Sequence, residues 1–267
     1  MRTSIVLFAL ACFVKSGFAH DYWIAPVTYQ PQVGQGLPVR LFVGDHFNGE
    51  IERPLQEKMT VTFKLHDSLD HVSDLLEGAV FEKTPITNLM LTKSGSYLVS
   101  MQRDWSFIEM KGDKFHQYLE HEGLSHIIKQ RTDAGDAEKS ATERYRRYLK
   151  SLVVADGKPT DTWKKSLGHK LEIMPLSDPS TTDVGKRLVV QVFFDGKPLV
   201  DVQVGAMGRK EGEVTDRHAR TDKSGKVSFK IDHPGEWIVR MVHLRQSTDP
   251  EEADWESFWS AMTFGVQ

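Results

Sequence analysis

The sequence predicts a mainly β protein, with two immunoglobulin-like antiparallel β-sandwich units and a helical insertion between them. Three observations support this fold class. Short runs of alternating apolar and polar residues occur towards both ends of the chain, and this is the period of a half-buried strand. Glycine-containing turns separate the runs, and a charged middle region has helical spacing instead. We expect the units at residues 20–110, 111–170 and 171–267, after a leading segment, residues 1–19.

The leading segment has the pattern of a secretory signal peptide. Arg2 supplies a positive charge, the apolar run Ile5–Val14 follows, and the small residues Gly17 and Ala19 come next. The run is too short for a bilayer, which needs about 20 residues, and no later stretch is a candidate transmembrane helix. We therefore expect cleavage after Ala19, a mature chain that begins at His20, and a periplasmic or secreted location.

Composition excludes several classes of function. Cys12 is the only cysteine, so the expected mature chain has neither a disulfide nor a thiolate for catalysis or metal binding. Removal of Arg2 and Lys15 with the signal leaves 32 basic against 37 acidic residues, a net charge near −5. This weak acidity argues against nucleic acid as a partner and is compatible with cation binding.

The first unit contains three clear strand patterns. Alternate residues are apolar in Leu37–Val43 and in Met59–Leu65, and Ser96–Met101 follows a Ser94-Gly95 turn. The pattern predicts a β sheet with one buried face in this part of the chain.

The middle unit differs because its apolar residues recur at three- and four-residue steps. Phe115, Tyr118 and Leu119 form one such group. A second runs from Ala141 to Leu152, with tyrosines and leucines between. This spacing predicts amphipathic helices packed on the β body, joined by a polar loop over residues 131–140.

The second β unit begins near residue 187. The run Arg187–Phe194 meets Asp195-Gly196, a dipeptide that favours a tight hairpin turn between strands. Trp237–His243 and the run from Phe258 to Val266 predict the last two strands.

His20 is the first candidate metal ligand. A mature chain that begins there offers two nitrogens, the α-amine and the imidazole, which can chelate one ion. An added histidine would complete an all-nitrogen site of the kind that suits Cu(II) or Ni(II). The alternative is an exposed terminus, but Tyr22, Trp23 and Ile24 follow at once and predict a packed one.

His46 and His243 are the other two candidate ligands. His46 follows a predicted buried strand directly and starts a loop, a place where functional groups are often presented. His243 shares a strand face with Trp237 and Met241, so it is either a satisfied core histidine or a ligand at the strand end. Asp254 and Glu256 lie just before the last strand and are candidates to orient a ligand imidazole, or are part of a solvated turn.

The remaining histidines carry a weaker signal. His116, His121 and His126 repeat every five residues, which on a helix points them in different directions. We place the other five on the surface: His66, His71, His169, His218 and His233. Motifs for a P-loop, a dinucleotide fold or a serine hydrolase are absent from the sequence.

Several stretches, in order along the chain, resemble a family of exported bacterial proteins. It is a domain-of-unknown-function family described as the periplasmic component of a cobalt or nickel uptake system (NikM-like). The stretches that carry the resemblance are residues 19–23, 44–47, 114–124, 143–150, 167–173, 237–243 and 254–264. The resemblance implies a β-rich periplasmic protein that captures Ni(II) or Co(II) for a separate membrane permease, with His20, His46 and His243 as the motif positions able to bind metal.

Three functions therefore stand as hypotheses. The first is a periplasmic metal-binding protein that serves nickel or cobalt uptake. The second is a copper oxidase in which His20 and another histidine brace the ion, as in lytic polysaccharide monooxygenases. The third is a metal-free β-sandwich binding module, which a fold alone does not exclude.

Overall fold

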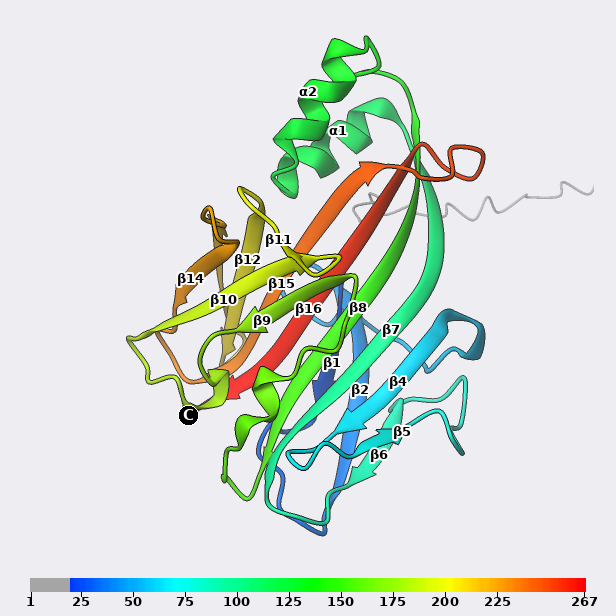
Figure 1. Cartoon of the computed structure of the whole chain (residues 1–267). Coiled ribbons are helices and arrows are strands. Elements are labelled where there is room, and N and C mark those ends of the chain that lie inside the picture. The colour runs from blue at the N-terminus through cyan, green and yellow to red at the C-terminus, as the bar shows by residue number, and fades with distance from the viewer. Residues whose placement is uncertain (1–19) are drawn as a thin grey trace, which may run out of the picture.

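A computed structural model describes residues 20–267, so the predicted signal peptide, residues 1–19, lies outside the described residues. The body consists of stacked β sheets, and two helices stand at one end of the longest strands (Figure 1). The prediction of a mainly β, sandwich-like fold is confirmed. No helix in residues 20–267 is long and apolar enough to cross a membrane.

An eight-stranded sheet forms the centre of the molecule and takes strands from both halves of the chain. Its spatial order is β13-β12-β15-β16-β8-β7-β4-β5. In chain order its strands are β4 (Thr60–His66), β5 (Val72–Asp74), β7 (Gly95–Met110), β8 (Ala141–Ala155), β12 (Gln203–Lys210), β13 (Glu213–Arg220), β15 (Gly235–Gln246) and β16 (Trp255–Val266). All neighbours are antiparallel except β8 and β16, which run parallel and join the N-terminal strands to the C-terminal ones.

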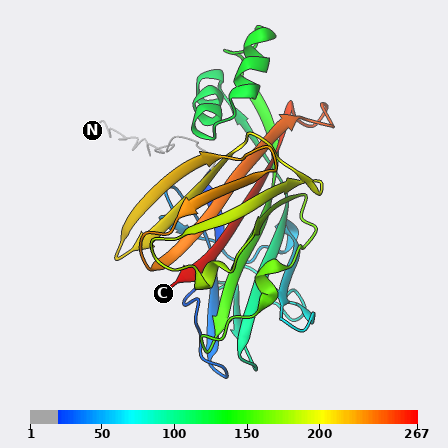
Figure 2. The same ribbon diagram turned by 60° about the vertical axis from the view of Figure 1, so that its left-hand side comes forward.

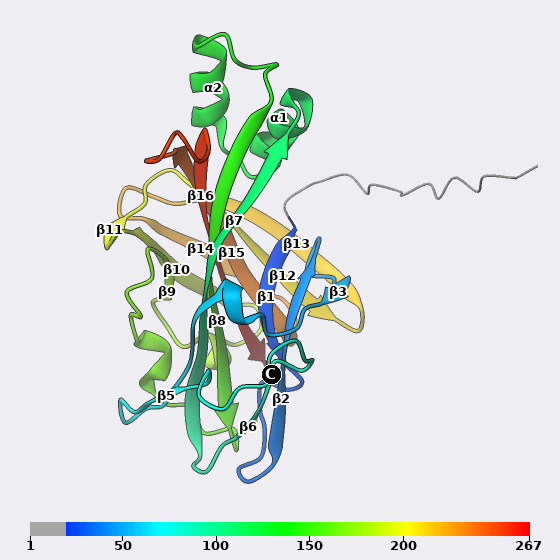
Figure 3. The ribbon, with the colours of Figure 1, turned by 90° about the vertical axis from the view of Figure 1, so that its right-hand side faces the viewer.

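Two smaller sheets cover the central sheet, one on each face (Figure 3). The first contains β1 (Asp21–Pro26), β2 (Gly36–Gly44), β3 (Ile51–Glu52) and β6 (Thr87–Met90). The second contains β9 (Leu171–Pro175), β10 (Arg187–Phe194), β11 (Lys197–Pro198) and β14 (Lys226–Lys230). Three 3₁₀ turns complete the connections, at Glu57–Met59, Asp161–Lys164 and Pro179–Thr181.

Successive residues of the central strands enter different cores, as the alternation of side chains along a strand requires. Ile238 packs in the core under the first small sheet, and its neighbour Val239 packs in the core under the second. Leu149 and Leu152 are divided in the same way. The two sandwiches predicted from sequence therefore share one sheet, and both of its faces are buried.

The helices α1 (Gly112–His121) and α2 (Ser125–Asp133) stand at one end of the long central strands (Figure 2). They pack on the same face of the central sheet as the first small sheet. Phe115, Tyr118 and Leu119 of α1 pack on Val242 and Trp259 of the central sheet. The predicted insertion, residues 111–170, is therefore helical only over its first part.

The predicted helix from Ala141 to Leu152 is wrong, because this segment is strand β8. Tyr148 and Leu152 face one core while Leu149 and Val153 face the other. A strand that is buried on both faces needs apolar residues at odd and even positions alike, and steps of three and four then arise without a helix.

Candidate functional site

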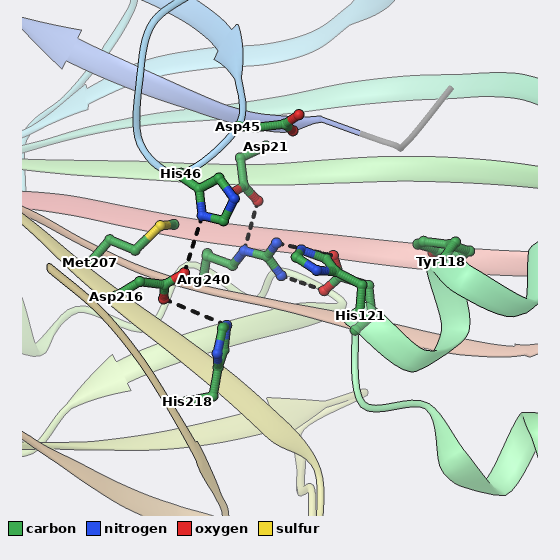
Figure 4. Close-up of a pocket in the computed structure, with 10 residues that line it drawn as sticks. Asp21, Asp45, His46, Tyr118, His121, Met207, Asp216, His218 and Arg240 are labelled. Atoms are coloured by element: carbon green, nitrogen blue, oxygen red, sulfur yellow. Dashed lines mark hydrogen bonds and ion pairs between the residues drawn. The ribbon is translucent and has the colours of Figure 1, made fainter. Parts of the chain in front are cut away.

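A polar cavity of about 330 Å³ lies between the first small sheet, helix α1 and the edge of the central sheet (Figure 4). We call it the histidine cavity. Its lining residues come from β1, the loop after β2, α1, β12, β13 and β15. They are Asp21, Asp45, His46, Tyr118, His121, Glu122, Met207, Asp216, His218 and Arg240.

The loop that follows β2 holds His46 at the cavity in an unusual backbone conformation. His46 and Phe47 have φ angles of 50° and 56°, in the left-handed region that few non-glycine residues adopt. Phe47 is fully buried against Trp23, and its carbonyl accepts a hydrogen bond from Arg209 at 2.9 Å. Gly44 begins the turn, where a Cβ would lie 1.8 Å from the carbonyl oxygen of Asn48. The fold thus imposes this conformation, a feature typical of functional loops.

Strand β13 contributes an aspartate and a histidine on one face. Asp216 and His218 are two residues apart, so both side chains point the same way. Asp216 lies between two imidazoles: its Oδ2 is 3.4 Å from Nδ1 of His46 and its Oδ1 is 3.6 Å from Nε2 of His218. Gly205, opposite His218 on β12, leaves the room that the histidine ring and Arg240 occupy.

The end of helix α1 closes the cavity with a third imidazole. The His121 ring lies 6.4 Å from that of His46, centroid to centroid, at an interplanar angle of 90°. His46 and His218 lie on either side of Asp216, whereas His121 lies across Arg240 from them (Figure 4). Three imidazoles from distant parts of the sequence therefore line one cavity, two of them beside Asp216 and the third, His121, beside Glu122.

Arg240 forms the floor of the cavity and is neutralised by two buried carboxylates. Its Nε lies 2.7 Å from Asp21, and its guanidinium also pairs with Glu122. Burial opposes the charge of Arg240, but Asp21 and Glu122 outweigh it and hold its pKa above the ordinary value. Burial raises the pKa of Asp21, although Arg240 acts in the other direction.

The cavity as a whole favours cations. Among residues 20–267, four carboxylates line it, and Arg240 is the one lysine or arginine that does so. Since Arg240 is already paired with Asp21 and Glu122, the negative charges of Asp45 and Asp216 are left to act on a ligand. Imidazole nitrogens combined with carboxylate oxygens suit borderline divalent ions such as Ni(II), Co(II), Cu(II) and Zn(II) better than Ca(II) or Mg(II).

The side chains in the described structure are paired with one another. Within residues 20–267, no three histidine, cysteine, aspartate or glutamate groups already stand where they could share one ion. A metal between His46 and His218 would replace their contacts with Asp216, and the exposed His46 side chain has room to turn. The geometry thus fits an ion that enters by small side-chain rotations.

His20 lies beside this cavity but faces away from it. Its Nδ1 is 2.8 Å from Oδ1 of Asp45, and Asp45 itself lines the histidine cavity. The His20 side chain lines a neighbouring cavity that also contains Arg53, Arg103 and Arg147. His20 is therefore bonded to the residue that precedes His46 in the chain, but the arginines make the surroundings of His20 cationic.

His243 is separated from the other two candidates by the central sheet. It is three residues from Arg240 on β15, so the two side chains lie on opposite faces. Its ring packs on Phe194 at 4.4 Å, and burial lowers its pKa to about 4. The structure does not bring His243 together with His46, and its surroundings are those of a neutral core histidine.

Asp254 and Glu256 bind groups other than imidazoles. Asp254 accepts hydrogen bonds from the backbone and hydroxyl of Thr142. Glu256 is fully buried and paired with Arg144 and Arg245, which hold its pKa below the ordinary value against the effect of burial. These contacts fix the loop before β16 and leave neither carboxylate to orient a candidate ligand.

His121, Asp216 and His218 were not among the residues that we predicted for the site. The aspartate–x–histidine spacing on a strand was the available signal for two of them, because it places both side chains on one face. Two further surface assignments are wrong: His66 and His169 are buried.

Solved structures give only distant likenesses. A DUF4785 family protein from Legionella pneumophila is 11% identical, with 81% of this chain and 51% of that one covered at a TM-score of 0.24. A tetra-tandem repeat from the extending region of a large adhesion protein is 11% identical. The match covers 92% of this chain and 49% of that one, at a TM-score of 0.21. Elastase-activated alpha-2-macroglobulin from Escherichia coli is 12% identical. The match covers 93% of this chain and 23% of that one, at a TM-score of 0.22. The chain spans about half or less of the length of these proteins.

Family comparison is more informative. No curated protein matches the chain significantly. A family model described as a domain of unknown function, DUF4198, matches residues 17–245, which include every residue that lines the histidine cavity. The chain therefore belongs to the DUF4198 family of proteins.

Proposed function

We propose that this protein binds a divalent transition-metal ion of the nickel and cobalt class in the histidine cavity. The observation that carries the proposal is that Asp216 lies between His46 and His218, at 3.4 Å and 3.6 Å, in a cavity that His121 also lines. Neutral imidazoles are the commonest protein ligands for such ions. A bare surface cluster would not need the strained loop that presents His46.

The wider role follows the resemblance described above. The protein captures Ni(II) or Co(II) outside the cytoplasm and passes the ion to a separate membrane permease. The partly exposed side chains of His46 and Asp216 leave the ion accessible to a partner from one side.

Calorimetric titration of the chain that begins at His20 with Ni(II), Co(II), Cu(II) and Zn(II) tests the proposal. We expect one site, with affinity reduced at least about 10- to 100-fold in His46→Ala and His218→Ala, because even residues that only orient a ligand have effects of that size. His71→Ala is the matched control, since His71 bonds Asp67 at 2.9 Å as an exposed pair outside the cavity. No binding by the wild-type chain, or equal loss in all three variants, would refute the proposal.

A second form of the chain separates this site from a copper brace at the terminus. One added glycine before His20 removes the α-amine chelate but leaves the histidine cavity unchanged. We expect this form to bind metal as the first form does. Binding that disappears on the addition would instead assign the ion to His20, whose ring nitrogen Nδ1 would have to leave Asp45.

A further inference from the structure

A second cavity, of about 420 Å³, lies on the other side of His20 and is lined by three arginines. We call it the arginine cavity. Arg103 and Arg147 are buried in its wall and Arg53 lies at its exposed edge. Tyr22, Gln56 and Tyr145 also line it. It opens beside the histidine cavity but shares no lining residue with it.

The two buried arginines have no carboxylate partner within ion-pair distance in residues 20–267. Arg103 donates one hydrogen bond, to the side-chain oxygen of Gln56 at 2.7 Å, and the Arg147 side chain donates none within the described part of the chain. Nε and one terminal nitrogen of Arg103, Nε of Arg147 and the hydroxyl of Tyr22 are buried without a partner. Glu143, the carboxyl whose pKa Arg147 lowers, is bonded to Ser257 and Tyr118 instead.

The other buried arginines of residues 20–267 have carboxylate or backbone carbonyl partners, which distinguishes them from this pair. Arg144 binds Glu252 and Glu256, and Arg240 binds Asp21 and Glu122. Arg131 donates to three backbone carbonyls, at residues 136, 137 and 139. Burial of a cation without an anion is costly, so unpaired arginines at a cavity indicate a missing counter-charge.

Aromatic rings hold the guanidinium groups in place without neutralising them. The guanidinium carbons of Arg103 and Arg147 each lie 4.9 Å from the centre of the Tyr22 ring. Arg147 also lies 4.5 Å from the centre of the Tyr145 ring. These contacts orient the planar groups and leave N–H donors unused, an arrangement suited to oxygen pairs.

We propose that the arginine cavity binds a small oxyanion, a carboxylate or phosphate group held by Arg103 and Arg147 with Arg53 at the entrance. The forked guanidinium matches the paired oxygens of either group. The cavity volume admits such an anion or the end of a small organic molecule that carries one. The proposal is independent of the metal site, because it uses none of the residues of the histidine cavity.

Thermal unfolding and calorimetry with metal-free protein test this site. The wild-type protein is measured in sodium phosphate, sodium succinate and sodium chloride at equal ionic strength. We expect phosphate or succinate at about 100 times its Kd to raise the Tm by about 5–10 °C relative to chloride. A larger Tm increase in phosphate than in succinate indicates a phosphate ligand, and the reverse indicates a carboxylate. Equal Tm values in all three salts overturn the proposal.

Variants locate the effect. Arg147→Met removes the guanidinium at similar length, and we expect it to weaken binding about 10- to 150-fold, as for loss of a charged hydrogen bond. Arg53→Met changes only the exposed edge, cannot disturb the core, and is expected to weaken binding several-fold. Arg187→Met is the matched control, since Arg187 is an exposed arginine that bonds Ser228. The assignment is overturned if both cavity variants bind the anion as tightly as wild type, or if Arg187→Met weakens binding as much as they do.

Discussion

We predict that the buried carboxyl of Glu143 makes the stability of this protein depend on pH between about 4.5 and 7. Glu143 is 1% exposed, and its Oε1 accepts hydrogen bonds from Ser257 and from Tyr118. Its second oxygen is buried without a partner. Burial raises the pKa of Glu143 to about 7, and the hydrogen bonds and Arg147 oppose this only in part.

The sign and size of the effect follow from the two pKa values. The unfolded chain has the ordinary value of 4.5, so between pH 4.5 and about 7 the folded state holds more protons than the unfolded state. The free energy of unfolding therefore falls as the pH rises through this range and becomes level above it. At about 1.4 kcal/mol for each pKa unit, the total loss is about 3 kcal/mol.

Urea unfolding at pH 5, 6, 7 and 8 measures this loss. Glu143→Gln keeps an acceptor for Ser257 and Tyr118 but does not titrate, so the stability of the variant relative to wild type should improve by about 3 kcal/mol from pH 5 to pH 8. Glu109→Gln, an exposed change on the neighbouring strand, should follow wild type. Parallel pH profiles for wild type and Glu143→Gln would refute the reasoning.

Three further predictions concern other buried or crowded groups. Lys150→Met should lower the free energy of unfolding by about 3–5 kcal/mol, because Nζ of Lys150 is 3.0 Å from Glu172 and the variant would leave that buried carboxylate without its partner. A free energy of urea unfolding near the wild-type value would contradict this. Gly44→Ala should cost about 1–3 kcal/mol in thermal unfolding, since its methyl would overlap the carbonyl of Asn48; an unchanged Tm would show that the loop yields freely. The pKa of His243 is lowered to about 4, so the free energy of unfolding should fall by about 3 kcal/mol as the pH falls from 6.5 to 4. His243→Gln should not show that loss in acid titrations followed by circular dichroism.

Sequence patterns predicted the strands that have clear alternation. The predicted runs around Leu37–Val43 and Met59–Leu65 correspond to β2 and β4, and the Asp195-Gly196 turn joins β10 to β11. Strand β8 was missed because its two faces enter different cores, so its apolar residues follow no single period. The sharing of one sheet by both halves depends on the parallel pairing of β8 with β16, which is a contact between segments about a hundred residues apart.

The site could be predicted only in part. His46 was found because it directly follows a strand with a clear pattern, and local sequence is enough for that argument. His121 and His218 reach it through the docking of α1 and the edge position of β13, and neither is a local property. The unpaired state of Arg103 and Arg147 was equally hidden, because it depends on which carboxylates the fold places elsewhere.

The long separation of the residues around Asp216 affects when the protein can first hold an ion. His46 and Asp216 are 170 residues apart, and they meet only after the central sheet has joined both halves of the chain. A chain that crossed a membrane in the unfolded state would bring no assembled metal site with it. The ion would then be bound only in the compartment where the chain completes its folding. The strand order has this consequence because it places the metal-site residues on segments that meet only in the assembled sheet.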